Sequence, residues 1–404
     1  MDLNLKKMWP ALAASLVAFT TVVNADYNSS SQNTMTQQNG TQVQVNVQNQ
    51  PMVKNGVGPD MMITPNAYHT NTVFFSGEAL FWWAREGGLE FGIQDSEYDD
   101  ANSIINNGKM LEPCPGWNAG FRLGLGYVFH RDGWDLDLWW THYQNGQGDC
   151  DDDCDDCCVV PDVAPIITMW SDLPTDGNNL TADDYSTKWK VNLNIVDLEL
   201  GRAFMTSKWL ELRPFVGVRG AWTNESYKIN YFDVNHVNPE PFDDADIVFV
   251  SEDRVSMKNK WWGVGPKAGV NSRWGLCWGF SLYGDAAISL LYGKFKVRHS
   301  ETIEGSAVTD DVTTSFSDVN ELHYTNKWET GRAVTDIALG LEWGHDFDGN
   351  WGLGFNFGWE QHLFFNANQF WRVLRTGDNN TQTFAHERGD LSFQGFTLGG
   401  RIYF

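Results

Sequence analysis

The chain has 404 residues, with 52 acidic side chains against 28 basic ones and a formal net charge of −24. This excess of acid argues against nucleic acid and anionic membrane surfaces as partners. Aromatic residues make up 14% of the chain, including 20 Trp, and there are 39 Gly. A soluble protein seldom needs so many tryptophans, whereas a membrane β-barrel places them in belts at its two interfaces.

Residues 1–25 have the pattern of a signal peptide. Lysines at positions 6 and 7 precede an apolar run over residues 9–23, and Ala25 ends a Val-Asn-Ala cleavage site. The run is short for a membrane anchor and no stop-transfer flank follows, so we expect cleavage before Asp26. After this point no run of 18 apolar residues occurs, and the sequence offers no transmembrane helix.

Residues 26–72 are rich in Gln, Asn, Ser and Thr and poor in charged and apolar residues. This composition predicts a flexible periplasmic extension. Val43, Val45 and Val47 alternate with polar residues, so a short strand or a docking segment remains an alternative there.

From residue 73 to residue 404 the apolar residues recur with a period of two, which indicates β-strands. In residues 351–359, for example, Trp, Leu and Phe occupy one face while Gly and Asn occupy the other. Each such run has about the 9 to 11 residues that a tilted strand needs to cross a bilayer. The predicted strands are 73–84, 117–129, 134–143, 185–204, 209–223, 259–271, 276–291, 331–345, 350–362 and 393–404.

The lengths of the connections between these strands favour a membrane barrel over a soluble β-sandwich, because long and short connections alternate strictly. The predicted long connections are 85–116, 144–184, 224–258, 292–330 and 363–392. The predicted short turns are 130–133, 205–208, 272–275 and 346–349, and two of them contain the Asp-Gly pair that tight hairpins prefer. We therefore predict an all-β fold, an antiparallel transmembrane β-barrel of 10 to 12 strands with short periplasmic turns, long extracellular loops and both termini periplasmic. Residues 226–234 and 247–255 also alternate, and are either extra strands or hairpins that project outward.

The final strand carries the pattern of a C-terminal β-signal, which runs polar, any, Gly, any, any, apolar, any, aromatic. The specified positions are filled by Thr397, Gly399, Ile402 and Phe404. The last strand has to pair with the first so that no edge is exposed in lipid. We therefore expect the barrel assembly machinery of a bacterial outer membrane to be a partner during biogenesis, with outer-membrane lipid as the surroundings of the finished barrel.

Two stretches resemble the Legionella-type major outer-membrane protein family, whose pore-forming barrels also occur in chlamydia-like bacteria. They are EALFWWAREGGLE at 78–90 and PGWNAGFRLGLGY at 115–127, the latter continuing into DGWDL at 132–136. The resemblance covers 78–143 and the C-terminal strand and is vague in the long loops. It implies a diffusion pore, often with cysteine cross-links between chains, and it supplies no catalytic residue.

Four of the six cysteines lie in one acidic segment of the second long loop. Adjacent cysteines and the absence of paired C-x-x-C modules fit zinc poorly, and the segment lacks the residue order of a calcium loop. Exported cysteines more often form disulfides, so we expect disulfides within this loop or between neighbouring molecules of a homo-oligomer, with metal binding and free thiols as alternatives. The disulfide candidates are Cys114, Cys150, Cys154, Cys157 and Cys158.

The polar strand faces are expected to line the lumen. The predicted pore-lining residues are Glu78, Arg122, Asp135, Asp137, Asp197, Glu199, Arg213, Arg219, Asp285, Asp336, Glu342, Glu360 and Arg401. Nine acids against four bases predict a lumen that favours cations, and a web of salt bridges bracing a filled barrel is the alternative. We also expect inward glycines to widen the space, namely Gly120, Gly124, Gly126, Gly352, Gly354 and Gly358.

No enzyme motif is present, although barrels of this size include lipases and proteases. Such enzymes need converging polar groups, and His142 with Asp137 is the best remaining pair. The sequence therefore predicts an outer-membrane, porin-like protein without catalytic activity, cofactor or metal. It is expected to pass ions and small hydrophilic solutes and to serve also as a structural surface protein. Surface adhesion, or a structural barrel with a filled lumen and disulfide-linked loops, is the alternative.

Overall fold

The computed structural model describes residues 72–94, 108–113, 116–129, 134–145, 165–175, 178–237, 247–347, 351–376 and 381–404. The chain divides into two units, Met1–Gly56 and Val57–Phe404, and all described residues belong to the second. These residues form β-structure and connecting segments. Among them, no helix is long and apolar enough to cross a membrane.

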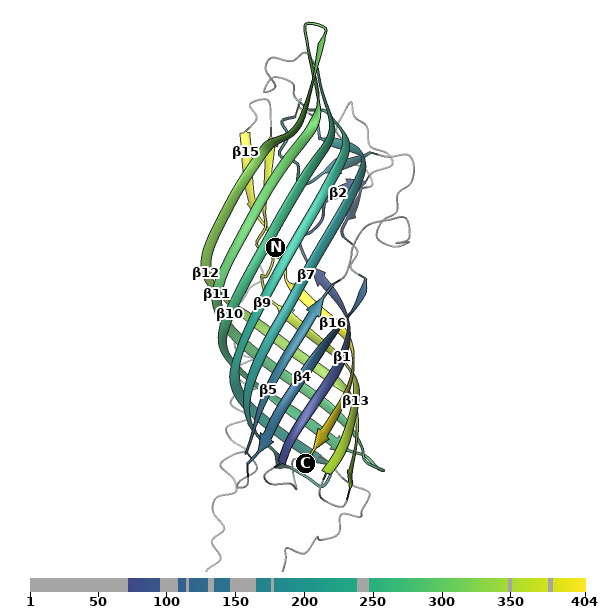
Figure 1. Ribbon diagram of the computed structural model, residues 1–404, viewed down its shortest axis with the longest axis vertical. Helices are drawn as coiled ribbons and strands as arrows, with labels where there is room; N and C mark the ends of the chain where they lie inside the picture. The colour runs from purple at the N-terminus through teal and green to yellow at the C-terminus, as the bar shows by residue number, and fades with distance from the viewer. Residues whose placement is uncertain are drawn as a thin grey trace, which may run out of the picture. The chain divides into compact units, whose positions relative to one another are not determined.

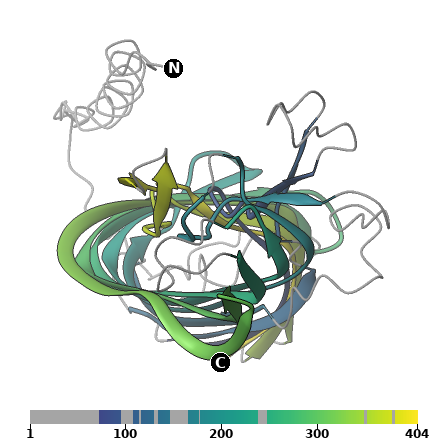
Figure 2. The same cartoon turned by 90° about the horizontal axis from the view of Figure 1, so that it is seen from above.

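In the part of the chain that the structure describes, ten long antiparallel strands form a ring. Figure 1 shows this ring from the side and Figure 2 shows it end-on. Each strand pairs with the next, and the last strand pairs with the first, so that the sheet closes on itself. In ring order the strands are β1 (Thr72–Glu86), β4 (Trp117–Val128), β5 (Trp134–Gln144), β7 (Thr181–Arg202), β9 (Leu210–Asn235), β10 (Ile247–Gly275), β11 (Phe280–Thr309), β12 (Val312–Phe347), β13 (Trp351–Phe364) and β16 (Leu391–Tyr403).

The closure involves Phe404, the residue that follows β16. Val73 and Phe404 exchange two backbone hydrogen bonds, with N···O distances of 2.9 and 3.0 Å. Following the paired residues once round the ring from Phe74 leads back to Glu86 on the same strand, 12 residues further on. For ten strands this stagger gives a strand tilt of about 40° and a backbone radius of about 10 Å.

The outward face of the ring is apolar between two belts of exposed aromatic side chains. The upper aromatic belt contains Trp117, Trp222, Trp262 and Tyr292, and the lower aromatic belt contains Phe129, Trp134, Trp274, Phe280 and Phe404. On β4 the two belts are separated by the 12 residues from Trp117 to Phe129, which corresponds to about 30 Å along the barrel axis. This height matches the hydrocarbon core of a bilayer, so the wall between the belts is the membrane-spanning part.

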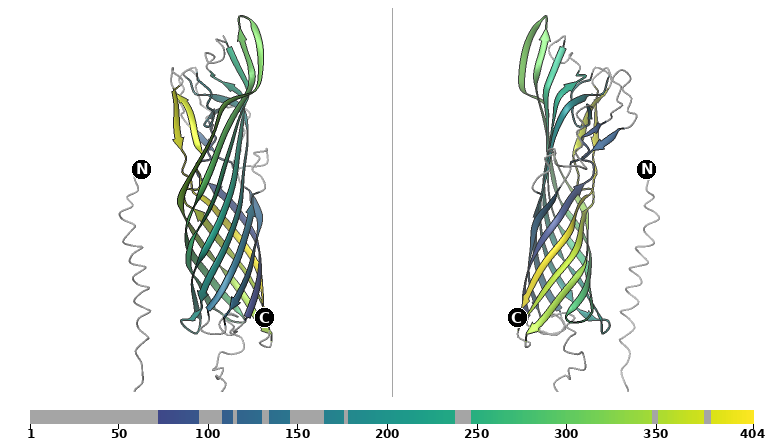
Figure 3. Two further views of the ribbon diagram at one scale, coloured as in Figure 1. Left: turned by 60° about the vertical axis from the view of Figure 1, so that its left-hand side comes forward. Right: turned by 90° about the vertical axis from the view of Figure 1, so that its right-hand side faces the viewer.

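Strands β7 and β9–β12 continue well beyond the upper ends of the other ring strands, as Figures 1 and 3 show. They therefore extend past the upper aromatic belt. The predicted bounds were wrong here, because most of the supposed loops 224–258 and 292–330 is strand. β9 runs to Asn235, and β11 and β12 are joined by the two residues Asp310 and Asp311, both with positive φ. The alternating residues 226–234 and 247–255 belong to the extended parts of β9 and β10. They form a hairpin that projects outward, which is one of the two structures that the sequence predicts for them.

The turn predicted at 272–275 was also misplaced. β10 continues to Gly275, and the chain reverses over residues 276–279, where Trp278 and Gly279 have φ values of 56° and 80°. The Phe280 amide donates to the Cys277 carbonyl oxygen at 3.0 Å. The run of apolar residues at 276–282 resembles a strand in sequence, but its first half is the turn.

Shorter strands lie in the connecting segments. They are β2 (Gly92–Gln94), β3 (Lys109–Leu111), β6 (Ile166–Thr168), β8 (Phe204–Met205), β14 (Trp371–Thr376) and β15 (Thr381–His386). β6 extends the sheet beside the upper part of β7, whereas β14 and β15 form a separate hairpin. The connections before β2, around β6 and before β14 bring apolar residues against the upper inner wall, as described below.

Candidate functional site: the barrel interior

The predicted pore-lining residues all belong to the inner face of the wall. Twelve of the thirteen surround one cavity of about 180 Å³ at the height of the membrane, and the other, Asp135, contacts Arg213 beside it. We call this set, together with Lys267, Arg273 and His362, the charged layer. The alternation of side chains along a strand explains the arrangement, because the opposite face of each strand meets lipid.

Ion pairs connect the charged layer across the ring rather than only between neighbouring strands. Arg219 on β9 donates to both carboxylate oxygens of Asp197 at 2.7 Å and to Asp336 on β12 at 2.7 Å. Lys267 on β10 donates to Asp197 and Glu199, both at 2.7 Å. β9 and β12 are separated by two strands, so this contact crosses the lumen.

Two further groups extend the charged layer downward. Arg213 binds Asp135 and donates to Asp137 at 2.7 Å. Arg273 on β10 donates to Glu342 on β12 at 2.8 Å, and β11 lies between these two strands. The two arginines and their three carboxylate partners in these groups are all largely buried. Each buried charge is therefore stabilised by its ion-pair partner rather than by water.

The upper edge of the charged layer is organised by Glu360 on β13. It accepts hydrogen bonds from Arg122 at 2.9 Å, from the indole nitrogen of Trp82 at 3.1 Å and from the Thr397 hydroxyl. Arg122 also donates to Glu78 at 2.7 Å. His362 lies 2.7 Å from Asp336 and 3.4 Å from Glu360, joining this group to that of Arg219.

Sequence reasoning missed three members of this layer. Lys267 alternates with the outward residues Pro266 and Ala268, and this alternation is the signal in the sequence that indicates its inward position. Arg273 falls inside the misplaced turn, and His362 is not among the predicted pore-lining residues. With Lys267 and Arg273 included, the excess of acid inside the barrel is smaller than predicted.

Several of the inward glycines do not widen the lumen, contrary to expectation, although Gly354 borders the cavity and a Cβ atom there would meet its nearest contact at 3.7 Å. A Cβ atom on Gly126 would lie 2.1 Å from the Phe74 ring, and one on Gly352 would lie 2.0 Å from the Tyr403 ring. Gly124 is covered in the same way by Trp139, at 2.3 Å. Aromatic side chains from the adjacent strands thus occupy the space that these glycines leave.

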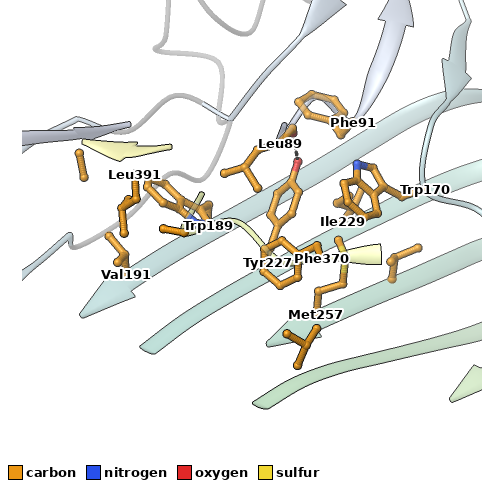
Figure 4. Close-up of a cluster of buried hydrophobic side chains, with 14 of the residues drawn as sticks. Leu89, Phe91, Trp170, Trp189, Val191, Tyr227, Ile229, Met257, Phe370 and Leu391 are labelled. Carbon is orange, nitrogen blue, oxygen red and sulfur yellow. Dashed lines mark hydrogen bonds between the residues drawn. The ribbon is translucent and has the colours of Figure 1, made fainter. Parts of the chain in front are cut away.

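Above the charged layer the interior becomes apolar. We call apolar layer the buried cluster formed by inward side chains of the upper wall and by Leu89, Phe91, Trp170 and Phe370 from the connecting segments. Figure 4 shows Tyr227 on β9 pointing between Leu89, Trp170 and Phe370. Trp170 and Phe370 are fully buried, with ring centroids 6.4 Å apart.

A few hydrogen bonds tie the connecting segments to the wall beneath them. Tyr227 and Tyr231 donate their hydroxyl protons to the carbonyl oxygens of Leu89 at 2.7 Å and Phe91 at 2.6 Å. Asn259 on β10 donates to the Ala367 carbonyl oxygen at 3.0 Å. The apolar layer therefore combines the permanent wall with segments that are not part of the ring.

Two buried carboxyl groups face each other inside the apolar layer. Glu86 at the upper end of β1 and Glu225 on β9 are 4% and 2% exposed, and both lie above the upper aromatic belt. Burial raises the pKa of Glu225 to about 8, and burial together with the proximity of Glu225 raises the pKa of Glu86. Asn259 donates to Glu225 at 3.2 Å, which connects this pair to Ala367.

The remaining predicted residues are placed as follows. On β16, which pairs with β1 and β13, Thr397 and Gly399 face inward and Ile402 faces outward. Phe404, directly after the strand, is also outward and exposed. His142 contacts Asn194 at 3.0 Å on the outer side, whereas Asp137 faces the lumen, so the best catalytic pair suggested by the sequence does not meet. All five cysteines predicted to form disulfides lie outside the described residues. The described Cys277 is a free, exposed thiol.

Comparison with known proteins gives one family and several barrels. The family model described as "Legionella pneumophila major outer membrane protein precursor" matches residues 64–404. No curated protein matches.

The chain is similar to the outer membrane protease OmpT from Escherichia coli, with 10% identity, a TM-score of 0.34 and coverage of 82% of this chain and 96% of that one. It is similar to a Pseudomonas aeruginosa FadL homologue, with 7% identity, a TM-score of 0.26 and coverage of 84% and 91%. It is also similar to the Ralstonia pickettii toluene transporter TbuX, with 9% identity, a TM-score of 0.26 and coverage of 84% and 90%.

The family match covers most of the chain, and the expected family is confirmed. The closed ring, its two aromatic belts and this match place the protein in the outer membrane of a bacterium. The chain belongs to the Legionella major outer membrane protein family.

Proposed function

We propose that this protein is a narrow, gated diffusion channel for ions and small hydrophilic solutes. The observation that carries the proposal is the composition of the apolar layer, whose central side chains come from connecting segments. Trp170 and Phe370 can leave the lumen without breaking any strand pairing of the ring. Below them lies a polar, charged cavity, which a pore for hydrophilic solutes requires.

The charged layer supports a narrow channel rather than a wide one. A backbone radius of about 10 Å leaves little free width once inward side chains are added, since about eight strands already fill their interior. The contact between Arg219 and Asp336, which crosses the lumen, reduces the free width of the lumen further. Passage past this level requires solutes to compete for charges that are now paired with one another.

The second candidate is a structural surface barrel with a permanently filled lumen. It is favoured by the ion pairing of Arg122, Arg213, Arg219, Lys267 and Arg273, because buried charges with good partners brace a barrel without any need for flow. A hydrolase is not proposed, since the histidine and the acid that the sequence suggested lie on opposite faces of β5.

Single-channel recording with refolded full-length protein in planar bilayers tests the proposal. We expect rare, small openings for the natural chain, and a clearly higher open probability for Trp170→Ser combined with Phe370→Ser. Phe384→Ser is the matched control, since Phe384 is an exposed aromatic residue in the same connection as Phe370. It should behave like the natural chain.

Correct folding of each variant can be checked by the change in gel mobility on heating. If the natural chain and the double variant are both correctly folded and neither produces channel openings in the bilayer, the channel proposal fails and the structural barrel is favoured. An increase with Phe384→Ser equal to that of the double variant would show that the apolar layer is not the gate.

A further inference from the structure

The outer face of the extended wall, just above the upper aromatic belt, is strongly basic. Three successive rows of outward positions cross β7, β9, β10, β11 and β12 in register. We call these rows the basic band. Eight of its fifteen positions are basic, namely Lys188, Lys190, Lys228, Lys258, Lys260, Lys296, Arg298 and Lys327. The other seven are Asn192, Asn224, Ser226, Ser256, Ser300, His323 and Thr325.

No Asp or Glu occupies any position of the basic band, in a chain with 52 acidic residues against 28 basic ones. The neighbouring rows are different. In the row below, Lys294 is paired with Glu329 at 3.5 Å, and above the band Arg254 is paired with Glu252 and Glu304 at 2.6 and 2.8 Å. The excess of positive charge is thus confined to one level of the wall.

Like charges lie directly opposite each other within the basic band. Lys260 is opposite Lys296, which is opposite Lys327 on the next strand, and Lys258 is opposite Arg298. Such pairs across neighbouring strands are destabilising when nothing compensates them. The pKa of Lys296 is lowered, mainly by the charge of Arg298. An arrangement with this cost suggests a ligand that supplies the missing negative charge.

The height of the band indicates what that ligand is. With a rise of about 3.3 Å per residue and a tilt of about 40°, the eight bases lie about 5 to 15 Å above the upper aromatic belt. Their side chains point away from the lumen, so they meet whatever surrounds the barrel at that level. Aromatic belts lie at the headgroup boundary, and the zone directly outside it contains lipid headgroups.

We propose that the basic band binds the phosphate groups of lipids in the outer leaflet of the outer membrane. The net charge of −24 argued against anionic membrane surfaces, but it averages over the whole chain and hides this local excess. Lysine and arginine bind phosphate oxygens through charge-assisted hydrogen bonds, and rows of Asn, Ser and Thr add neutral donors beside them. The site recognises lipid from the side of the barrel, so it is independent of whether the lumen conducts.

Binding of diphosphoryl lipid A to refolded full-length protein in zwitterionic detergent tests this inference. The test variant is Lys260→Gln, Lys296→Gln and Lys327→Gln combined, which removes three neighbouring charges from one row. The matched control is Arg85→Gln, Lys109→Gln and Lys208→Gln combined, which removes three exposed charges outside the band. Heat-dependent gel mobility confirms that each barrel is folded before binding is measured.

We expect the natural chain to bind diphosphoryl lipid A at least tenfold more tightly than the same lipid without phosphates, and less tightly as salt is added. A lysine near an anionic headgroup surface contributes roughly fivefold in affinity, so the test variant should bind on the order of 100-fold more weakly. The control should change less than threefold.

Equal binding of phosphorylated and dephosphorylated lipid would overturn the proposal, as would equal losses in the two variants. Competition with inorganic phosphate separates lipid from free phosphate. Lipid binding that persists at 20 mM phosphate supports a headgroup site, whereas displacement at that concentration would contradict it.

Discussion

Arg219 on β9 and Asp336 on β12 are joined across the lumen by a contact of 2.7 Å between a guanidinium nitrogen and a carboxylate oxygen. The side chains are 3% and 13% exposed, so neither charge is well hydrated. This single contact ties together two parts of the wall that do not pair with each other through the backbone. It therefore stabilises the barrel and narrows its lumen at the same time.

Replacing Arg219 by Met should reduce the free energy of unfolding by about 3 kcal/mol, because Asp197 and Asp336 would lose a buried partner. Urea-induced unfolding of the refolded barrel measures this loss. Arg254→Met is the control, since Arg254 is partly exposed above the membrane and its exposed ion pairs contribute less than about 1 kcal/mol. Losses of the same size in both variants would contradict the role assigned to Arg219.

Gly352 and Tyr403 should be energetically coupled. Gly352→Ala places a Cβ atom against the Tyr403 ring and should cost about 1 to 3 kcal/mol of unfolding free energy, as overpacking does elsewhere. All three of the nearest atoms belong to the Tyr403 side chain, so Tyr403→Ala combined with Gly352→Ala should cost less than the sum of the two single changes. Additive costs in a double-mutant cycle would count against this contact.

The stability of the apolar layer should fall as pH rises. The pKa of Glu225 is raised by burial from 4.5 to about 8. The folded chain therefore retains a proton that the unfolded chain releases above pH 4.5. Stability from this group is present below pH 4.5 and is lost as the pH rises through about 8.

Hydrogen exchange of backbone amides near Leu89 and Ala367, measured between pH 5 and pH 9 and corrected for intrinsic exchange, follows this change. Glu86→Gln combined with Glu225→Gln keeps both positions neutral and should remove most of the dependence, because burial raises the pKa of both carboxyl groups. An unchanged profile in that variant would assign the dependence to another group.

Open channels should prefer cations. The inward acids outnumber the inward bases even after Lys267 and Arg273 are counted, and a lumen of negative charge concentrates cations. The sign of the reversal potential in a potassium chloride gradient shows whether the open channel prefers cations or anions. Lys267→Gln should shift it further toward cations, and an anion-selective reversal potential for the natural chain would refute the prediction.

The barrel was predictable from sequence because its main constraints are local. A strand between lipid and lumen must alternate, so residues such as Trp134, Leu136 and Leu138 mark one face without any knowledge of the neighbours. The same alternation groups Glu78, Arg122 and the other predicted residues on one face of their strands, and twelve of them border the cavity.

What could not be predicted depends on contacts between distant residues. Nothing near Gly126 indicates that Phe74, from another strand, fills the space beside it. Likewise, Trp170 and Phe370 lie in segments without period, and only the folded chain shows that they meet Tyr227 inside the wall. Loops that fold into a lumen leave no repeating pattern in the sequence.

The direct pairing of β1 with β16 also restricts how the molecule can be made. Val73 has its final partner only when Phe404 has been synthesised, so a growing chain that lacks its last strand has two open sheet edges. In lipid each unpaired backbone group is costly, and no shorter piece of the ring avoids that cost. Insertion of the ring into the membrane is therefore expected to follow the synthesis of β16, which supplies the partner of β1.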